Sequence, residues 1–422
     1  MKSKNKFTVV IIMMNNTEKV LMSLSSLSIY KGVLGRSVPK AFYRLLKASK
    51  ENPESFLQSY GEFFALLSER GYSDTFAKSM GEAIMFDENC FTRAATSGSA
   101  ENLHENVLFA AKRDCISLME STALTPEDII NSCAFKSEIE YIVPSLPKWE
   151  QGSFPKELEH IKESMDELLN FHRENGCGMF ARYKAFIWRT GGIRPVMYPD
   201  VVTLENLKGY EIQRNAVIEN TKAFLQGKTC NNCLLYGDKG TGKSSTVKAV
   251  VNSMRKQGLR IVEIPKERLM DFPLLVDAIA AVPLKFIIFI DDLSFNKQDE
   301  SYASLKAVLE GGLAATPKNA LIYATSNRRH IVKESVSDRD TDDLNRRDNM
   351  EESLSLSDRF GLSVCFSSPS KDNFLKIVRA LAAQNGVDMD VTELEKGAER
   401  FALERGGRSP RCAKQYIESL FV

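Results

Sequence analysis

Hydrophobic residues recur at two different spacings along this 422-residue chain, and the spacing changes once. From about residue 17 to 180, apolar residues recur three or four positions apart, as they do over 56–67. This spacing is typical of amphipathic helices. After about residue 200, helical stretches alternate with short continuous apolar runs, which indicates parallel strands covered on both faces. We therefore predict a mostly helical N-terminal domain followed by an α/β domain.

The α/β part contains five apolar runs that predict buried strands. They are 234–236, 261–264, 286–290, 320–324 and 364–366. Stretches rich in Pro and Gly at 143–155 and 190–199 punctuate the chain. We predict an N-terminal domain over 1–190, a linker over 191–200, an α/β core over 201–369 and a helical segment over 370–422.

The apolar run 7–14 follows three lysines and mimics a short signal peptide, but no small-residue cleavage pattern follows it. We interpret the run as an N-terminal strand, or as a leader upstream of a start at Met13 or Met14. No run approaches the roughly 18–20 apolar residues of a membrane span. We therefore predict no membrane partner.

Residues 237–244 have the full pattern of a phosphate-binding loop, GDKGTGKS, between a predicted strand and a predicted helix. The glycines allow a tight turn that points N–H groups at phosphate oxygens, and the helix N-terminus adds its positive dipole end. Lys243 can reach the β- and γ-phosphates, and the Ser244 hydroxyl can bind Mg²⁺. We predict ATP and Mg²⁺ as cofactors. The predicted binding residues of this loop are Gly237, Asp238, Lys239, Gly240, Thr241, Gly242, Lys243, Ser244 and Ser245.

Polar side chains follow the next predicted strands at the same edge of the sheet. The strand 286–290 ends in Asp291 and Asp292, which burial of the strand places beside the phosphate-binding loop. We predict that Asp291 holds Mg²⁺, directly or through water, and that Asp292 polarises the attacking water. Asn327 follows the strand 320–324 and is predicted to orient this water or contact the γ-phosphate.

Two arginines are predicted to complete the site. Arg359 is the predicted arginine finger, a group worth about 10³–10⁵ in rate where it acts in trans. A helix that begins near Pro410 would aim Arg411 at the nucleotide, with Arg408 as the alternative. We therefore also predict a homo-oligomer in which Arg359 reaches the nucleotide of a neighbouring subunit.

This ordered set of motifs resembles the AAA+ ATPase superfamily over about 201–422. The chain is similar to one uncharacterised prokaryotic family of predicted AAA+ ATP-binding proteins. The residues that carry this similarity are LKGYE (207–211), DDLSF (291–295), ATSNRRH (324–330) and LSDRFGL (356–362). The resemblance implies an α/β core, a small helical lid from about residue 370, and ATP bound between them. It also implies that the segment 201–210, which contains Gly209 and Tyr210, flanks the adenine.

Two departures from the superfamily pattern bear on function. The second acid is usually Glu, whereas here it is Asp292. Asp is shorter by roughly 1.5 Å, and catalytic positioning is sensitive at about 1 Å, so we expect slow hydrolysis or a partner that completes the site. Where unfoldases carry an aromatic–apolar–Gly pore loop, the segment 268–273 reads RLMDFP, which argues against threading a polypeptide through a ring.

Composition limits the classes of function. Hydrophobic residues make up 43% and charged residues 26%, an ordinary globular mix, and the net charge of +1 indicates no general attraction to nucleic acid. The eight cysteines are scattered, and Cys230 and Cys233 have no second ligand pair at the spacing of a zinc site. A cytoplasmic location is expected, because the cytosol keeps such thiols reduced. The polar stretch 333–353 predicts a loop, and Arg328 and Arg329 are expected to have structural or intersubunit roles.

We predict a Mg²⁺-dependent ATPase that couples ATP binding and hydrolysis to remodelling or assembly of a protein or nucleic-acid partner. The helical N-terminal domain is expected to recognise that partner or to make the assembly. The alternative is an ATP-gated binding module with slow turnover. A small-molecule phosphotransferase would leave Asn327, Arg359 and Arg411 without a role.

Overall fold

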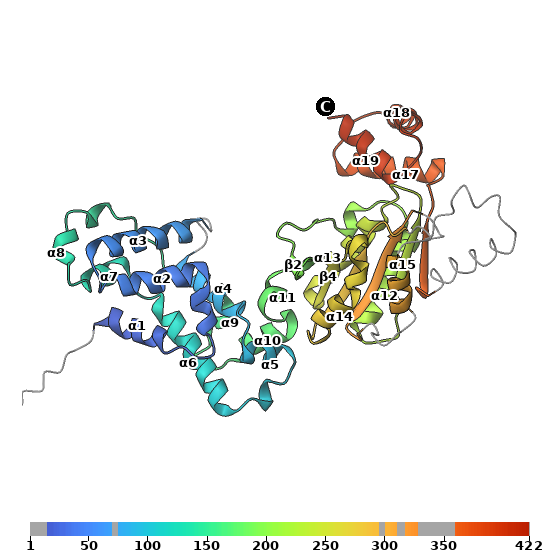
Figure 1. Cartoon of the computed structure of the whole chain (residues 1–422). Coiled ribbons are helices and arrows are strands. Elements are labelled where there is room, and N and C mark those ends of the chain that lie inside the picture. The colour runs from blue at the N-terminus through green and yellow to red at the C-terminus, as the bar shows by residue number, and fades with distance from the viewer. Residues whose placement is uncertain (1–14, 70–74, 295–299, 310–316, 328–358, 422) are drawn as a thin grey trace, which may run out of the picture. The chain divides into compact units, whose positions relative to one another are not determined.

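The computed structural model describes residues 15–69, 75–294, 300–309, 317–327 and 359–421. The chain divides into two compact units, Met1–Arg182 and Tyr183–Val422 (Figure 1). The apolar run 7–14, the polar stretch 333–353, and Arg328 and Arg329 lie outside the described residues.

The boundary between the units precedes the predicted linker over 191–200, which differs from the structure. Strand β2 (Gly192–Pro195) lies inside that range and pairs antiparallel with β1 (Ala185–Arg189). Arg189 lies opposite Gly192, so Thr190 and Gly191 form the turn between the strands, and Gly191 has a φ of 86°. The glycines therefore make a hairpin of the second unit rather than a linker.

Every element described in the N-terminal unit is helical, which confirms the predicted helical domain. The helices are α1 (Asn16–Ser25), α2 (Ser37–Ala48), α3 (Pro53–Ser68), α4 (Phe76–Met85), α5 (Cys90–Thr96), α6 (Glu105–Ser121), α7 (Pro126–Asn131), α8 (Lys136–Ile139), α9 (Lys156–Glu159), α10 (Asp166–Asn175) and α11 (Gly178–Arg182). The 3₁₀ turns are η1 (Lys31–Gly35), η2 (Ala100–Asn102) and η3 (Val143–Ser145). Aromatic rings fill the core: Phe42 lies 4.5 Å from Phe76, and Phe63 lies 4.9 Å from Trp149 between ring centroids. Such contacts give the unit a core of its own.

A seven-stranded sheet in the order β2-β1-β4-β5-β6-β3-β7 forms the centre of the second unit. The remaining strands are β3 (Cys233–Gly237), β4 (Leu259–Glu263), β5 (Lys285–Ile290), β6 (Ala320–Ser326) and β7 (Leu362–Phe366). Apart from β2, the described strands pair in parallel. All five predicted strands are confirmed, because continuous apolar runs such as β5 are buried on both faces.

Helices pack against both the sheet and one another in this unit (Figure 1). They are α12 (Glu211–Leu225), α13 (Lys243–Met254), α14 (Phe272–Ala280) and α15 (Glu300–Leu309), with 3₁₀ turns η4 (Leu204–Asn206), η5 (Arg255–Gln257) and η6 (Lys266–Asp271). Val217 of α12 and Val250 of α13 share one buried cluster with Leu235 and Phe289 of the sheet. This packing fixes the start of α13 at the carboxyl end of β3.

The chain ends in a helical lid with its own small core, as the predicted fold class requires. Its helices are α17 (Lys371–Gln384), α18 (Val391–Glu404) and α19 (Pro410–Ser419). Phe374, Ala398 and Ile417 are buried together, one from each helix. Side chains of Ser370, Asp390 and Ser409 cap the three helix starts. Across the described ranges, each helix is too short or too polar to cross a lipid bilayer.

Candidate nucleotide-binding site

The phosphate-binding loop connects β3 to α13 and has a left-handed backbone at three glycines. Gly237, Gly240 and Gly242 have φ values of 128°, 78° and 91°. A Cβ at Gly237 would lie 2.2 Å from the carbonyl oxygen of Phe366, so a larger residue would displace β7. Gly242 precedes α13 and provides no side-chain cap for it. The first N–H groups of α13 therefore lie where an anion can accept their hydrogen bonds.

Lys243 lies under this loop and is 7% exposed. Its Nζ donates to the carbonyl oxygens of Gly237 at 2.9 Å and Asp238 at 2.8 Å, and to Asn327 Oδ1 at 3.3 Å. Burial lowers the pKa of Lys243, and the charges of Asp238, Asp292 and Asp291 oppose this shift. The ammonium is thus held by neutral carbonyl oxygens beside the loop, in a position to pair with phosphate.

The acid pair lies directly against the start of α13. Ser244 Oγ donates to Asp291 Oδ1 at 2.6 Å, and Thr325 Oγ1 donates to the same oxygen at 2.6 Å. Asn327 Nδ2 donates to Asp292 Oδ1 at 2.5 Å. The structure therefore brings together the predicted residues that follow β3, β5 and β6. These residues are Lys243, Ser244, Asp291, Asp292 and Asn327.

Asp292 has an uncommon backbone conformation for a residue other than Gly, with a φ of 51°. This left-handed geometry costs about 1 kcal/mol and needs support from its surroundings. The Asp292 N–H donates to Thr325 Oγ1 at 3.0 Å, and the Leu293 N–H donates to the Thr325 carbonyl oxygen at 2.7 Å. Sequence reasoning missed Thr325, although it is a polar residue at the end of an apolar strand.

Ser244 and Asp291 offer a donor set that suits Mg²⁺. Both supply hard oxygen ligands, and their side-chain oxygens lie 2.6 Å apart. Protein sites for Mg²⁺ commonly contain only one or two such groups and leave the other positions to phosphate and water. The two predicted metal residues therefore fit this ion.

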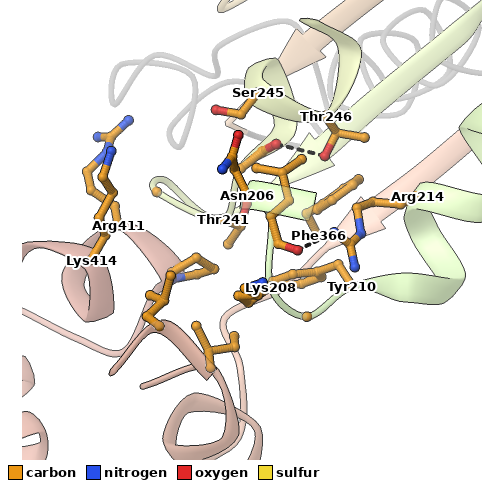
Figure 2. Close-up of a pocket in the computed structure, with 17 residues that line it drawn as sticks. Asn206, Lys208, Tyr210, Arg214, Thr241, Ser245, Thr246, Phe366, Arg411 and Lys414 are labelled. Atoms are coloured by element: carbon orange, nitrogen blue, oxygen red, sulfur yellow. Dashed lines mark hydrogen bonds between the residues drawn. The ribbon is translucent and has the colours of Figure 1, made fainter. Parts of the chain in front are cut away.

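A cavity of about 290 Å³ lies between the phosphate-binding loop, the segment 206–210 and the lid (Figure 2). Its lining includes Leu207, Phe366, Ile377 and Leu381, which form apolar walls. The charged residues that line it are all cationic among those described, namely Lys208, Arg214, Arg411 and Lys414. A ligand with a flat apolar part and negative charge matches this lining.

Gly209 and Tyr210, which the resemblance implies flank the adenine, line this cavity. The Tyr210 ring stacks on Phe366 with centroids 5.2 Å apart, and its hydroxyl donates to the Ser367 carbonyl oxygen at 2.6 Å. Burial raises the pKa of Tyr210 to about 12. A Cβ at Gly209 would lie 2.9 Å from Ile377 Cδ1. Gly209 thus lies against the first helix of the lid, and Tyr210 packs on the end of β7.

The predicted loop residues do not all face the cavity. Gly240, Thr241, Gly242 and Ser245 line it, whereas Lys239 is exposed and is not among the lining residues. The acid of the loop, Asp238, accepts a hydrogen bond from the Ser368 N–H at 2.6 Å. Hydrogen bonds from the Ser368 side chain and from this N–H lower the pKa of the Asp238 carboxyl.

The two lid arginines occupy different surroundings. Arg411 lines the cavity (Figure 2), and its backbone N–H donates to the Gly240 carbonyl oxygen at 3.1 Å. Arg408 does not line it and instead donates from Nε and Nη2 to the two carboxylate oxygens of Glu399, at 2.8 and 2.7 Å. The geometry therefore favours Arg411 over Arg408 as the lid arginine that meets a bound nucleotide.

Arg359 is exposed and does not line the cavity of its own chain. It precedes β7, whose first residue Leu362 lies level with Cys233 at the start of β3. The loop begins at the other end of β3, roughly 13 Å away at the usual rise per residue. The structure thus does not bring Arg359 to the other predicted residues within one chain.

Comparisons with known proteins place the second unit in a family. The model of the family described as "Protein of unknown function (DUF815)" matches residues 181–422. No curated protein matches the chain. The match to the family model confirms the predicted similarity to an uncharacterised family of AAA+ ATP-binding proteins.

Among solved structures, the chain is similar to the Thermotoga maritima RuvB Holliday junction branch migration motor. The identity is 16% and the TM-score 0.35, over 51% of this chain and 63% of that one, less than two thirds of its length. A single-substitution form of the same protein matches with 14% identity and a TM-score of 0.32, over 52% of this chain and 72% of that one. Structural similarity with TM-scores this low adds no information to the strand order of the sheet. The family model covers more than half of the chain, so the protein belongs to the DUF815 family.

Proposed function

We propose that this protein is a Mg²⁺-dependent ATPase of the AAA+ type. The observation that carries the proposal is the meeting of Lys243, Ser244, Asp291, Asp292 and Asn327 at one sheet edge, joined by hydrogen bonds of 2.5–3.3 Å. Three strand ends contribute to this cluster, which lies beside a loop built to bind phosphate.

Each residue of the cluster has a role that its position supports. Lys243 and the N–H groups at the start of α13 bind the β- and γ-phosphates. Ser244 and Asp291 hold Mg²⁺, which when bound neutralises charge on the transferred phosphoryl group. Asn327 orients the attacking water, and the Asp292 carboxylate, which its amide contacts at 2.5 Å, accepts the proton of that water.

The cavity beside the loop takes the rest of the nucleotide. Apolar side chains of Leu207, Ile377 and Leu381 accommodate the adenine, and Gly209 and Tyr210 shape this end of the cavity. Arg411 couples the lid to the phosphates, because its backbone already contacts the loop at Gly240. ATP would therefore bind between the core and the lid.

Arg359 acts in trans under this proposal. Its place at the opposite end of the β3–β7 pair excludes it from its own nucleotide but leaves it exposed for a neighbouring subunit. The site is then complete only in a homo-oligomer. We further propose a cytoplasmic protein that uses this assembly to remodel or assemble a protein or nucleic-acid partner, with the helical unit recognising the partner or making the assembly.

One observation favours a second candidate, an ATP-gated binding module with slow turnover. Asp292 is shorter than the usual Glu, and its Oδ1 is occupied by the Asn327 amide at 2.5 Å. A carboxylate held in this way reaches less far towards a water at the γ-phosphate. Nucleotide binding would then set the assembly without rapid hydrolysis.

Calorimetry with ATP and Mg²⁺, followed by phosphate release, tests the proposal on the wild-type chain and on Asp292→Asn. An ATPase is expected to bind ATP in both forms and to release phosphate about 10²-fold more slowly in Asp292→Asn. Tight binding with negligible release from both forms would support the binding module instead. No binding by folded wild-type protein would overturn both candidates.

Replacing the two lid arginines separately tests which one meets the nucleotide. Arg411→Ala is expected to weaken ATP binding about tenfold, the effect of one lost charge-assisted hydrogen bond. Arg408→Ala is expected to leave ATP affinity within about twofold, because its fork binds Glu399 rather than the cavity. Titration of a fluorescent ATP analogue measures both, and equal losses in the two variants would contradict the assignment.

A further inference from the structure

Thr325 is a buried hydroxyl residue that contacts both acids of the site. It is 2% exposed and follows Ala324, the last residue of β6 that pairs with β5. Its Oγ1 donates to Asp291 Oδ1 at 2.6 Å and accepts a hydrogen bond from the Asp292 N–H at 3.0 Å. One hydroxyl group therefore uses its donor and an acceptor on two consecutive acids.

The backbone of the same residue continues this attachment. The Leu293 N–H donates to the Thr325 carbonyl oxygen at 2.7 Å. The chain from Asp291 to Leu293 is thus tied to Thr325 at each residue, just where the regular β5–β6 pairing has ended. These bonds support the left-handed conformation of Asp292, whose N–H also donates to Asp291 Oδ1 at 3.2 Å.

The position of Asp291 depends on the same hydroxyl. Its Oδ1 accepts from Thr325 on one side and from Ser244 on the other, both at 2.6 Å. With the Asp292 N–H at 3.2 Å as a third donor, these bonds to Oδ1 hold the rotamer of the carboxylate. Groups that orient a metal-binding carboxylate in this way commonly change metal affinity or activity by about 10–100-fold when removed.

We propose that Thr325 is a positioning residue that sets the Asp291 carboxylate for the divalent ion and the Asp292 backbone for the attacking water. This inference rests on the proposed ATPase function and adds a residue to it. A buried Thr that only satisfies its own hydroxyl would bond one nearby carbonyl oxygen, as Thr246 does with Gly242 at 2.9 Å. Thr325 instead bonds the two acids.

Thr325→Val removes the hydroxyl at nearly constant volume, and Thr325→Ser keeps it. We would measure ADP binding in EDTA, the Mg²⁺ concentration that half-saturates ATP binding, and kcat and KM for phosphate release. Thr325→Val is expected to raise the half-saturating Mg²⁺ about tenfold and to lower kcat about 10–100-fold. Its ADP binding in EDTA should match wild type, and Thr325→Ser should stay within about threefold of wild type throughout.

The outcomes separate this inference from the proposed function. Wild-type protein that binds no ATP with Mg²⁺ would overturn the proposed function, and the inference with it. Wild-type protein that binds ATP, together with folded Thr325→Val of unchanged Mg²⁺ dependence and kcat, would overturn the inference alone. Thr325→Ala provides a second hydroxyl-free variant. If Val and Ala variants both fail to fold while Ser folds, the hydroxyl serves the fold and the inference is wrong.

Discussion

Lys243→Ala is expected to reduce ATP affinity by at least about 100-fold, which corresponds to two charge-assisted hydrogen bonds of roughly 1.5 kcal/mol each. The ammonium is 7% exposed and is held at the loop by the carbonyl oxygens of Gly237 and Asp238. Carbonyl oxygens carry only partial negative charge, so they balance the charge of the ammonium only in part. The ammonium forms a full ion pair when a triphosphate binds. Isothermal calorimetry with ATP and Mg²⁺ measures the loss directly.

Lys256→Ala provides the matched control for this substitution. Lys256 lies in η5, in the same unit, and is exposed away from the cavity lining. It should bind ATP as the wild type does, with the same melting temperature. Equal ATP affinity of Lys243→Ala and Lys256→Ala, with both proteins folded, would show that the loop does not bind the triphosphate through its lysine.

The core of the site could be predicted because its geometry follows from strand burial. An apolar run such as 286–290 must lie inside the sheet, so the acids after it must emerge at the carboxyl edge. The same logic placed Asn327 after β6. The phosphate-binding loop needed no tertiary information, since its conformation depends on local glycines.

The edge of the sheet could not be predicted in the same way. The β1–β2 hairpin is short, has partly exposed residues and contains Gly and Pro, so its sequence resembles a linker. Edge strands need no continuous apolar run, because one side has no partner. Its identity as sheet depends on pairing between β1 and β4, which are distant in sequence.

Side-chain contacts between neighbouring strands and helices also could not be predicted from the local sequence pattern. Thr325 meets Asp291 only because β5 and β6 lie side by side in register. The sequence favours Arg411 and leaves Arg408 as the alternative, and what separates them in the structure is Glu399 on the preceding helix, which binds Arg408. Pairings of this kind are set by packing rather than by residue spacing.

Arg359→Ala is expected to lower kcat for ATP hydrolysis about 10³-fold, the lower end of the range for an arginine finger, with ATP affinity nearly unchanged. The residue is exposed and is separated from its own phosphate-binding loop by the length of β3. Under the proposed function, we therefore expect it to contribute to turnover only when it reaches another subunit. Phosphate release and ATP titration on the same preparation separate kcat from binding.

Mixing two inactive variants then decides whether Arg359 acts between subunits. Arg359→Ala keeps an intact phosphate-binding loop, whereas Lys243→Ala keeps an intact Arg359. In an equal random mixture, about one interface in four therefore pairs an intact loop with an intact Arg359 from the neighbouring subunit. We expect the mixture to recover up to about a quarter of wild-type turnover. Mixing Arg359→Ala with the Lys243→Ala/Arg359→Ala double variant should recover none. Loss of activity in Arg359→Ala without recovery in the first mixture would place the arginine's effect within its own chain and contradict the shared site.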